Sequence, residues 1–228
     1  KHIRSEFGTV GEIDVDAVVR CLANIFSIAY FPRSKEYVAK VQKLVRIVPQ
    51  RELAFCAGCP HRASFWIIKT ALKWDGRDGF VTGDIGCYTL GLGPSGFSQI
   101  RTVHCMGAGI GVANGLGHLK KFGLDKPIIA LSGDSTFFHA CVPALINARY
   151  NRANITYIIF DNSATAMTGF QPHPGTGYNA LGEESPVVKP EEICKGIGVP
   201  VKICDPFNIK ECTSALYSMF QEEGTKVM

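Results

Sequence analysis

The sequence predicts an α/β protein: a three-layer, doubly wound fold in which helices cover both faces of a mainly parallel sheet. Two short apolar runs, residues 128–131 and 155–160, are rich in β-branched residues, and turn residues follow each of them. Such runs are typical of buried strands. Residues 140–152 between them have helical character, so strand, helix and strand follow one another. That order is the unit from which parallel sheets are built.

The other elements are expected on either side of this unit. Residues 14–31 and 34–47 have helical apolar spacing and end before prolines, so residues 1–49 are interpreted as a helical connector from a preceding domain. Residues 50–228 form the main domain. Its further predicted elements are a helix from Pro60 to Leu72, a strand at 80–82, a glycine-rich helix at 107–122, a short helix at 191–196, a strand at 201–204 and a helix at 209–222. The chain then stops at residues 226–228, where a last strand is still expected, so the domain is interpreted as truncated.

Composition and charge exclude several classes of protein. The hydrophobic fraction of 46% is enough for a full core, and the net charge is only +4. No basic run is dense enough for a nucleic-acid surface, and no apolar stretch reaches the roughly 18 residues of a membrane span. The start at Lys1 is neither an initiator Met nor a signal peptide. We therefore expect an internal fragment of a cytoplasmic protein, with no nucleic acid and no membrane as partner.

Polar side chains follow both strands of the central unit. Asp134 comes after the first strand and Asn162 after the second, and a loop of small residues that includes Ala164 follows Asn162. The carboxyl ends of parallel strands meet at one edge of the sheet, where such folds bind ligands. Two hard oxygen donors there, with a backbone carbonyl such as that of Ala164 as a third, suit Mg²⁺ carrying a diphosphate. The alternative is that Asp134 caps a helix and Asn162 makes a tight turn.

Nine cysteines are an odd and high number for such a domain. Cys56 and Cys59 form a C-x-x-C turn before a helix, and Cys87 ends the next strand, so the three can converge near Asp134. Iron–sulfur or zinc ligation, a redox pair and a structural role all remain open for them. A [4Fe–4S] cluster needs a fourth ligand, for which the candidates are Cys194, Cys204 or a residue beyond Met228.

Several longer motifs occur in a fixed order: Cys-Ala-Gly-Cys-Pro-His-Arg, Gly-Asp-Ile-Gly-Cys-Tyr-Thr-Leu-Gly, Cys-Met-Gly-Ala-Gly-Ile-Gly, Gly-Asp-Ser-Thr-Phe-Phe-His and Asp-Asn-Ser-Ala-Thr-Ala-Met-Thr-Gly-Phe-Gln-Pro-His-Pro-Gly-Thr-Gly. With them, about residues 50–225 resemble the thiamine diphosphate-binding domain of indolepyruvate:ferredoxin oxidoreductase alpha subunits, in the 2-oxoacid:ferredoxin oxidoreductase family. The resemblance implies decarboxylation of an aryl pyruvate, electron transfer through a cluster to ferredoxin, and formation of an acyl-CoA.

The resemblance also implies a set of site residues. Asp134, Asn162 and the Ala164 carbonyl would hold Mg²⁺, and Cys56, Cys59 and Cys87 would hold a [4Fe–4S] cluster. Independently of the resemblance, His61 and His139 sit beside these motifs and are the candidate catalytic residues, to touch substrate or shuttle protons; the alternative for each is a hydrogen-bonded structural role. Among relatives, the position of His61 often carries a Glu, Ser135 replaces a glycine, and Met167 replaces an Asn. The residues expected to contact thiamine diphosphate are Ile85, Gly86, Cys87, Met106, Gly133, Asp134, Ser135, Thr136, Asn162, Ala164, Thr165, Ala166 and Met167.

The implied partners are a pyrimidine-binding domain of the same subunit, a beta subunit, ferredoxin, a 2-oxoacid and coenzyme A. Because the pyrimidine-binding domain is absent, this chain is expected to be inactive alone. Two other functions stay open: a thiamine-dependent decarboxylase or synthase without electron transfer, and a non-catalytic zinc- or nucleotide-binding module. The long loop at residues 169–190 is interpreted as functional. His173, between two prolines of this loop, either closes a lid or fixes a turn.

Overall fold

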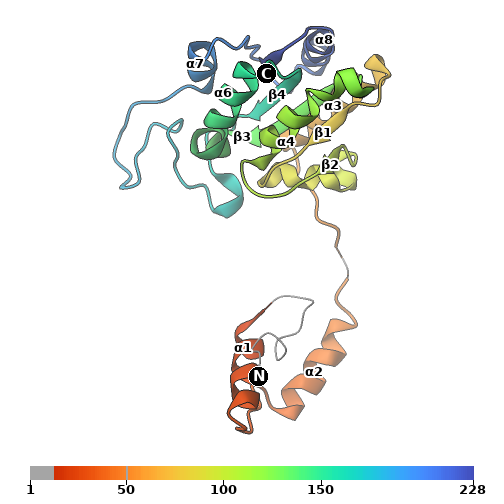
Figure 1. Cartoon of the computed structure of the whole chain (residues 1–228). Coiled ribbons are helices and arrows are strands. Elements are labelled where there is room, and N and C mark those ends of the chain that lie inside the picture. Colours follow the sequence, from red (N-terminus) through yellow and green to blue (C-terminus); the bar gives the residue numbers. More distant parts are fainter. Residues whose placement is uncertain (1–12, 50) are drawn as a thin grey trace. The chain divides into compact units, whose positions relative to one another are not determined.

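Five parallel strands form one sheet in the order β2-β1-β3-β4-β5, as the computed structural model shows (Figure 1). The strands are β1 (Phe80–Thr82), β2 (Ile100–Thr102), β3 (Ile128–Gly133), β4 (Ile155–Phe160) and β5 (Thr225–Val227). The structure describes residues 13–49 and 51–228, and it divides into two compact units, residues 1–52 and 53–228. The predicted doubly wound α/β fold is confirmed for the second unit.

Helices cover both faces of this sheet. They are α3 (Pro60–Asp75), α4 (Ala108–Leu116), α5 (Asp134–Thr136), α6 (Val142–Tyr150), α7 (Pro190–Gly196) and α8 (Ile209–Phe220). Because side chains alternate along a strand, β3 sends Ile129 and Leu131 to the face under α3 and α8, and Ile128 and Ala130 to the face under α4 and α6. Both faces are therefore apolar, which explains why the central strands are continuous apolar runs.

Several predicted boundaries differ from the structure. The expected strand at 201–204 is only an isolated bridge from Val201 to Val227, whereas a strand is present at Thr225–Val227, where the sequence suggested that the chain stops short of one. The strand β2 was not predicted, because it is three residues long and contains the polar Arg101. The expected helix at 107–122 is α4 followed by a separate 3₁₀ turn, Leu119–Phe122.

The helix predicted from residue 140 begins earlier. It starts with α5 at Asp134, passes through a π-helical segment, Phe137–Cys141, and continues as α6. Pro143 has no N–H to donate to the carbonyl four residues before it, so the regular α-helical pattern is interrupted there. The result places the first helical residue directly after β3.

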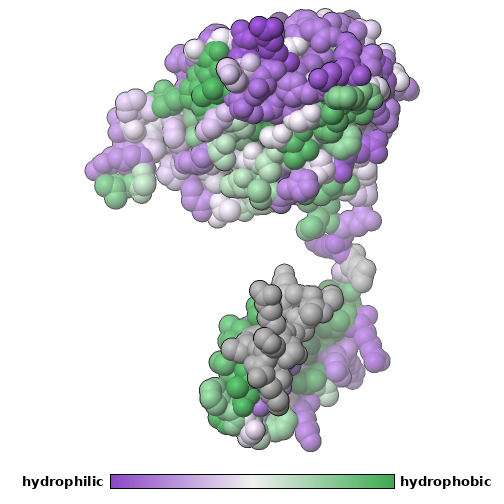
Figure 2. All heavy atoms as spheres, in the orientation of Figure 1, coloured by the Kyte–Doolittle hydropathy of each residue, from purple (hydrophilic) through white to green (hydrophobic). Residues whose placement is uncertain are grey.

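The first unit contains α1 (Val15–Ile25) and α2 (Lys35–Val45). The second agrees with the helix predicted at 34–47, whereas α1 ends well before residue 31, the predicted end of the first. The Asp14 carboxylate accepts a hydrogen bond from Ala17 N at 2.6 Å, and the Ser34 hydroxyl accepts one from Tyr37 N at 3.1 Å. Both are ordinary N-caps. Hydrophobic side chains are gathered on the surface of this unit (Figure 2). Residues 1–12 and residue 50 of the predicted connector and domain boundary lie outside the described part of the chain.

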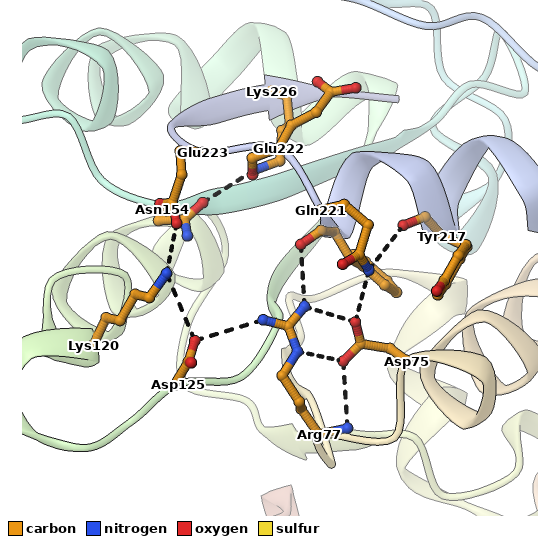
Figure 3. Close-up of polar contacts among 11 residues, drawn as sticks. Asp75, Arg77, Lys120, Asp125, Asn154, Tyr217, Gln221, Glu222, Glu223 and Lys226 are labelled. Carbon is orange, nitrogen blue, oxygen red and sulfur yellow. Dashed lines mark hydrogen bonds and ion pairs between the residues drawn. The ribbon is translucent and has the colours of Figure 1, made fainter.

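The amino edge of the sheet is closed by polar contacts (Figure 3). Arg77 donates to both carboxylate oxygens of Asp75 at 2.8 and 2.6 Å, and Lys120 pairs with Glu223 at 2.6 Å. Lys226 of β5 is 3% exposed and donates to Asn154 Oδ1 and to the carbonyls of Glu222 and Gly224. These contacts fix the amino ends of the strands and leave the carboxyl edge to loops.

Candidate functional site at the carboxyl edge of the sheet

The strand order has its switch point between β1 and β3, because the chain passes from β1 to β2 on one side and from β3 onward on the other. Ligands of open α/β sheets bind outside the carboxyl ends of the strands at such a point. The residues that follow β1 and β3 there are Asp84 and Asp134. Both side chains are buried, with Asp84 0% and Asp134 2% exposed.

Asp134 joins the end of β3 to the end of β4. Its Oδ1 accepts a hydrogen bond from Ser135 N at 2.8 Å, and its Oδ2 accepts one from Asn162 N at 3.1 Å. Burial raises the pKa of Asp134, because desolvation disfavours the carboxylate. The structure thus brings Asp134 and Asn162 together, as the sequence predicted for a metal pair.

The loop after Asn162 is held close to the start of the helix that follows β3. Thr165 donates from its hydroxyl to Ser135 Oγ at 2.9 Å, and Thr165 N donates to Gln171 O at 3.1 Å. Ser163 has φ +54°, so the backbone turns sharply between Asn162 and Ala164. Ala164, Thr165 and Ala166 are half-buried, whereas Asn162 and Met167 are exposed.

Tyr88 connects the loops that follow β1 and β3. Its hydroxyl donates to Ile85 O at 2.8 Å and lies 3.2 Å from Thr136 Oγ1, and burial raises its pKa to about 12. A Cβ at Gly86 would lie 2.5 Å from the Tyr88 ring, and one at Gly133 would lie 3.0 Å from it. These glycines therefore allow the two loops to approach each other.

The remaining residues predicted to contact the cofactor are distributed along the same edge. Ile85, Gly86, Cys87 and Ser135 are half-buried, and Thr136 is buried. Met106 is 54% exposed just before α4. They therefore lie along the same carboxyl edge of the sheet as Asp134.

The two candidate catalytic histidines differ in their surroundings. His61 is 7% exposed, and its ring lies among Phe55, Tyr88 and Phe160 at centroid distances of 5.8, 6.0 and 5.2 Å. Burial lowers its pKa, which favours the neutral ring. His139 lies in the π-helical segment and is exposed. The structure therefore separates a neutral, aromatic-packed histidine from a solvated one.

The predicted cluster ligands lie near one another. Cys59 N donates to Cys56 O at 3.2 Å, and Cys59 is the N-cap of α3. Burial raises the pKa of Cys87, and the neighbouring thiols of Cys59 and Cys56 raise it further. Of the two other candidates, Cys194 is fully buried in the cluster under α4 and α6, whereas Cys204 packs against the cluster under α3, as Cys59 does. Cys194 thus lies on the opposite face of the sheet from Cys59 and Cys204, and it is not placed to join them as a cluster ligand.

The donors at the end of β3 and β4 fit a hard cation. The Asp134 carboxylate, the Asn162 amide and the Ala164 carbonyl would supply oxygen only, which suits Mg²⁺ with the remaining positions taken by diphosphate oxygens. Among the described residues, no group of three His, Cys, Asp or Glu side chains could hold a metal ion. A cation there would depend on amide, carbonyl and ligand oxygens. The thiols of Cys56, Cys59 and Cys87 do not form such a group in this structure either.

Asp84 was given no role by the sequence analysis, and His173 was expected only to close a lid or to fix a turn. Asp84 accepts hydrogen bonds from Gly107 N and Ile85 N, and His173 Nε2 lies 3.1 Å from Asp134 Oδ2. Asp84 follows a glycine at the end of a strand, as Asp134 does. This similarity is the signal in the sequence that identifies Asp84 as a candidate site residue. No pattern in the sequence placed His173 beside Asp134.

Comparison with solved structures supports the same fold. A 2-oxoglutarate:ferredoxin oxidoreductase from Magnetococcus marinus has a TM-score of 0.63 and 17% identity, with 78% of this chain and 63% of that chain covered. Benzoylformate decarboxylase from Polynucleobacter necessarius has a TM-score of 0.52 and 16% identity, with 78% and 34% covered. Among the described residues, no helix is long and apolar enough to cross a membrane.

Curated relatives carry the name indolepyruvate oxidoreductase subunit IorA. That of Archaeoglobus fulgidus is 43% identical over 86% of this chain and 31% of its own length, and that of Thermococcus kodakarensis is 38% identical over 96% and 35%. This chain thus spans about a third of the length of these relatives. Residues 84–228 match the family described as thiamine pyrophosphate enzyme, C-terminal TPP binding domain. The predicted resemblance is confirmed, and the chain belongs to this family of thiamine pyrophosphate enzymes.

Proposed function

We propose that this chain is the cofactor-binding domain of a thiamine diphosphate-dependent 2-oxoacid:ferredoxin oxidoreductase that acts on an aryl pyruvate, such as indolepyruvate. The observation that carries the proposal is the hydrogen bond from Asn162 N to Asp134 Oδ2, at the switch point of the sheet. It fixes a buried carboxylate next to the Asn162 backbone, at the carboxyl edge where folds of this kind bind ligands. The identity to IorA proteins supports the substrate class.

In this proposal Asp134, Asn162 and the Ala164 carbonyl hold Mg²⁺ and the diphosphate. The helical segment that starts at Asp134 and continues through residues 137–141 into α6 would turn the positive end of its dipole toward the phosphates. Tyr88 and Gly133 keep the two loops close enough to form one cradle. Bound thiamine diphosphate supplies the nucleophilic carbon and the electron sink that decarboxylation of a 2-oxoacid requires.

The experiment is calorimetric titration of the chain with thiamine diphosphate, with and without Mg²⁺. We expect saturable binding that needs Mg²⁺ and that Asp134→Asn weakens at least tenfold, because the amide removes the negative charge facing the cation. The matched control is Asp125→Asn, whose carboxyl is 58% exposed at the amino edge. Equal binding by wild type and Asp134→Asn, or no Mg²⁺ dependence, would contradict the proposal and favour a non-catalytic module.

Electron transfer is a separate part of the proposal, supported by the proximity of Cys56, Cys59 and Cys87. We propose that they contribute to a [4Fe–4S] cluster that passes electrons to ferredoxin, with the acyl group taken by coenzyme A. The measurement is iron, acid-labile sulfide and zinc per chain after purification without oxygen. About four iron and four sulfide would support the cluster. Zinc alone would contradict it, and thiamine diphosphate binding without either metal would favour a decarboxylase or synthase.

The pyrimidine-binding domain, a beta subunit and ferredoxin complete the proposed enzyme as partners. The carboxylate that activates the aminopyrimidine of the cofactor is proposed to come from the first of these. Turnover is therefore not expected from this chain alone. An assay of the chain with indolepyruvate, coenzyme A and oxidised ferredoxin tests this directly, and substantial turnover would contradict it.

A further inference from the structure

The loop between β4 and α7 carries a buried histidine that the proposed function does not use. His173 has a side chain only 1% exposed, and its Nε2 lies 3.1 Å from Oδ2 of Asp134, whose side chain is 3% exposed. This contact does not count as a hydrogen bond, and Nε2 has no hydrogen-bond partner among the described residues. Buried polar atoms without a partner are rare, so this nitrogen needs an explanation.

The imidazole is held on both sides. Its Nδ1 accepts a hydrogen bond from Gly175 N at 3.1 Å, and the ring lies against Phe138 with centroids 5.5 Å apart. A Cβ at Gly175 would lie 3.0 Å from the Phe138 ring and 3.1 Å from the imidazole, so glycine permits this packing. The ring is therefore fixed in place before any ligand arrives.

The hydrogen bond to Nδ1 also fixes the tautomer. Because Nδ1 accepts from a backbone N–H, the ring proton lies on Nε2, which is therefore a donor. The turn that presents the ring is closed by Thr176, whose N and hydroxyl both donate to His173 O, at 2.9 and 2.8 Å. A rigid turn thus holds one N–H group beside the carboxylate that the proposed function assigns to the cation.

Asp134 has two oxygens and two sets of neighbours. Ser135 N donates to Oδ1, and Asn162 N donates to Oδ2. A carboxylate that turns one oxygen toward a divalent cation is commonly held by a hydrogen-bond donor on its outer side. His173 is the side chain whose unpartnered donor is already in position for this, and it belongs to the long loop rather than to the sheet.

We propose that His173 is a positioning residue: its Nε2–H donates to Asp134 when Asp134 binds the cation, so that occupancy of the site and ordering of the loop are linked. The proposal rests on the proposed function, because it takes Asp134 as a Mg²⁺ ligand. It goes beyond that function by giving residues 169–189 a role in binding the metal–diphosphate complex. Figure 1 shows this loop as a long excursion between β4 and α7.

The test compares His173→Leu and His173→Gln in the 228-residue chain by titration with Mg²⁺ and thiamine diphosphate. Leucine removes the donor, whereas the amide nitrogen of glutamine lies near the place of Nε2. We expect leucine to raise the Kd roughly tenfold or more, and glutamine to restore most of the affinity. His118→Leu is the matched control, since His118 is exposed and follows Gly117, whose carbonyl accepts from Asn154 N at the amino edge.

The second readout is amide hydrogen exchange of residues 169–189. Adding Mg²⁺ and thiamine diphosphate should slow exchange there in the wild type and in His173→Gln, and not in His173→Leu. Equal loss of affinity in both variants, or slowed exchange in His173→Leu, would overturn the positioning role while the proposed function stands. A wild type that binds no thiamine diphosphate would overturn both.

Discussion

Asp84 and Gly107 are joined by a forked hydrogen bond in which Gly107 N lies 2.9 Å from each carboxylate oxygen of Asp84. Asp84 follows β1, and Gly107 is the residue before α4. The contact therefore ties the loop that carries Cys87 to the loop that carries Met106. Gly107 has φ +84°, and a Cβ there would lie 2.5 Å from the Cβ of Ala140, so glycine is required at this junction.

We expect Asp84→Leu to lower the free energy of unfolding by about 2–4 kcal/mol, since it leaves the buried N–H groups of Gly107 and Ile85 without an acceptor. Asp84→Asn keeps one acceptor oxygen and should cost less. Urea unfolding measures both. Asp78→Asn is the control, because the Asp78 carboxyl is 76% exposed and the change should stay within about 0.5 kcal/mol. A leucine variant as stable as the wild type would show that this junction is not a structural anchor.

Two glycines of α4 should respond to alanine in opposite directions. A Cβ at Gly109 would lie 2.6 Å from Gly83 O, a backbone atom, whereas a Cβ at Gly111 would meet nothing within 4 Å. Gly111→Ala should stabilise the protein by about 0.5–1 kcal/mol through helix propensity. Gly109→Ala should destabilise it by about 1–3 kcal/mol, because α4 must move away from β1. Denaturant midpoints decide this, and the same sign for both variants would contradict the close packing of α4.

Lys226 should make stability depend on alkaline pH. Burial lowers its pKa to about 8, below the value of 10.5 for an unfolded lysine. Between these values the unfolded chain binds more protons than the folded one, so the free energy of unfolding should rise with pH, by about 3 kcal/mol in total from this group. Unfolding of Lys226→Met between pH 7.5 and 9.5 should lack that rise, whereas the exposed control Lys202→Met should keep it. A flat wild-type profile would contradict the prediction.

Thiol labelling should separate the cysteines into two groups. Cys56 and Cys105 are exposed, whereas Cys141, Cys194 and Cys212 are buried. Burial also raises the pKa of Cys194 to about 11 and that of Cys212 to about 12, which keeps these thiols protonated at pH 7.5. Maleimide labelling followed by peptide mass spectrometry should find the exposed pair modified first. Equally fast labelling of Cys194 would mean that α7 does not pack as described.

The central strands could be predicted because their signal is local. The run from Ile128 to Leu131 is apolar on both faces and is followed by Gly133, so length and composition alone identify a buried strand. The strand β2 has no such signal, and Val201 bonds to Val227 only as an isolated bridge. Short edge strands are defined by their partners, which the sequence does not reveal.

The site could be predicted only in part for a similar reason. Asp134 and Asn162 each follow a strong strand, so the meeting of their loops follows from parallel topology. Asp84 takes its role from Gly107, and His173 from Asp134, which are 23 and 39 positions away in the chain. Neither sequence separation corresponds to the repeat of a helix or a strand. Contacts of this kind arise from tertiary folding, which the spacing of residues along the chain does not encode.

The polar contacts around Arg77, Lys120 and Lys226 (Figure 3) lie at the amino edge of the sheet, whereas Asp134 follows the carboxyl end of β3. One consequence concerns how the domain can adapt. Lys120 and Glu223 are about half or more exposed. Substitutions of such charged residues can change thermal stability without altering the loops at the carboxyl edge. Selection for growth temperature and selection for substrate would then act on separate sets of residues.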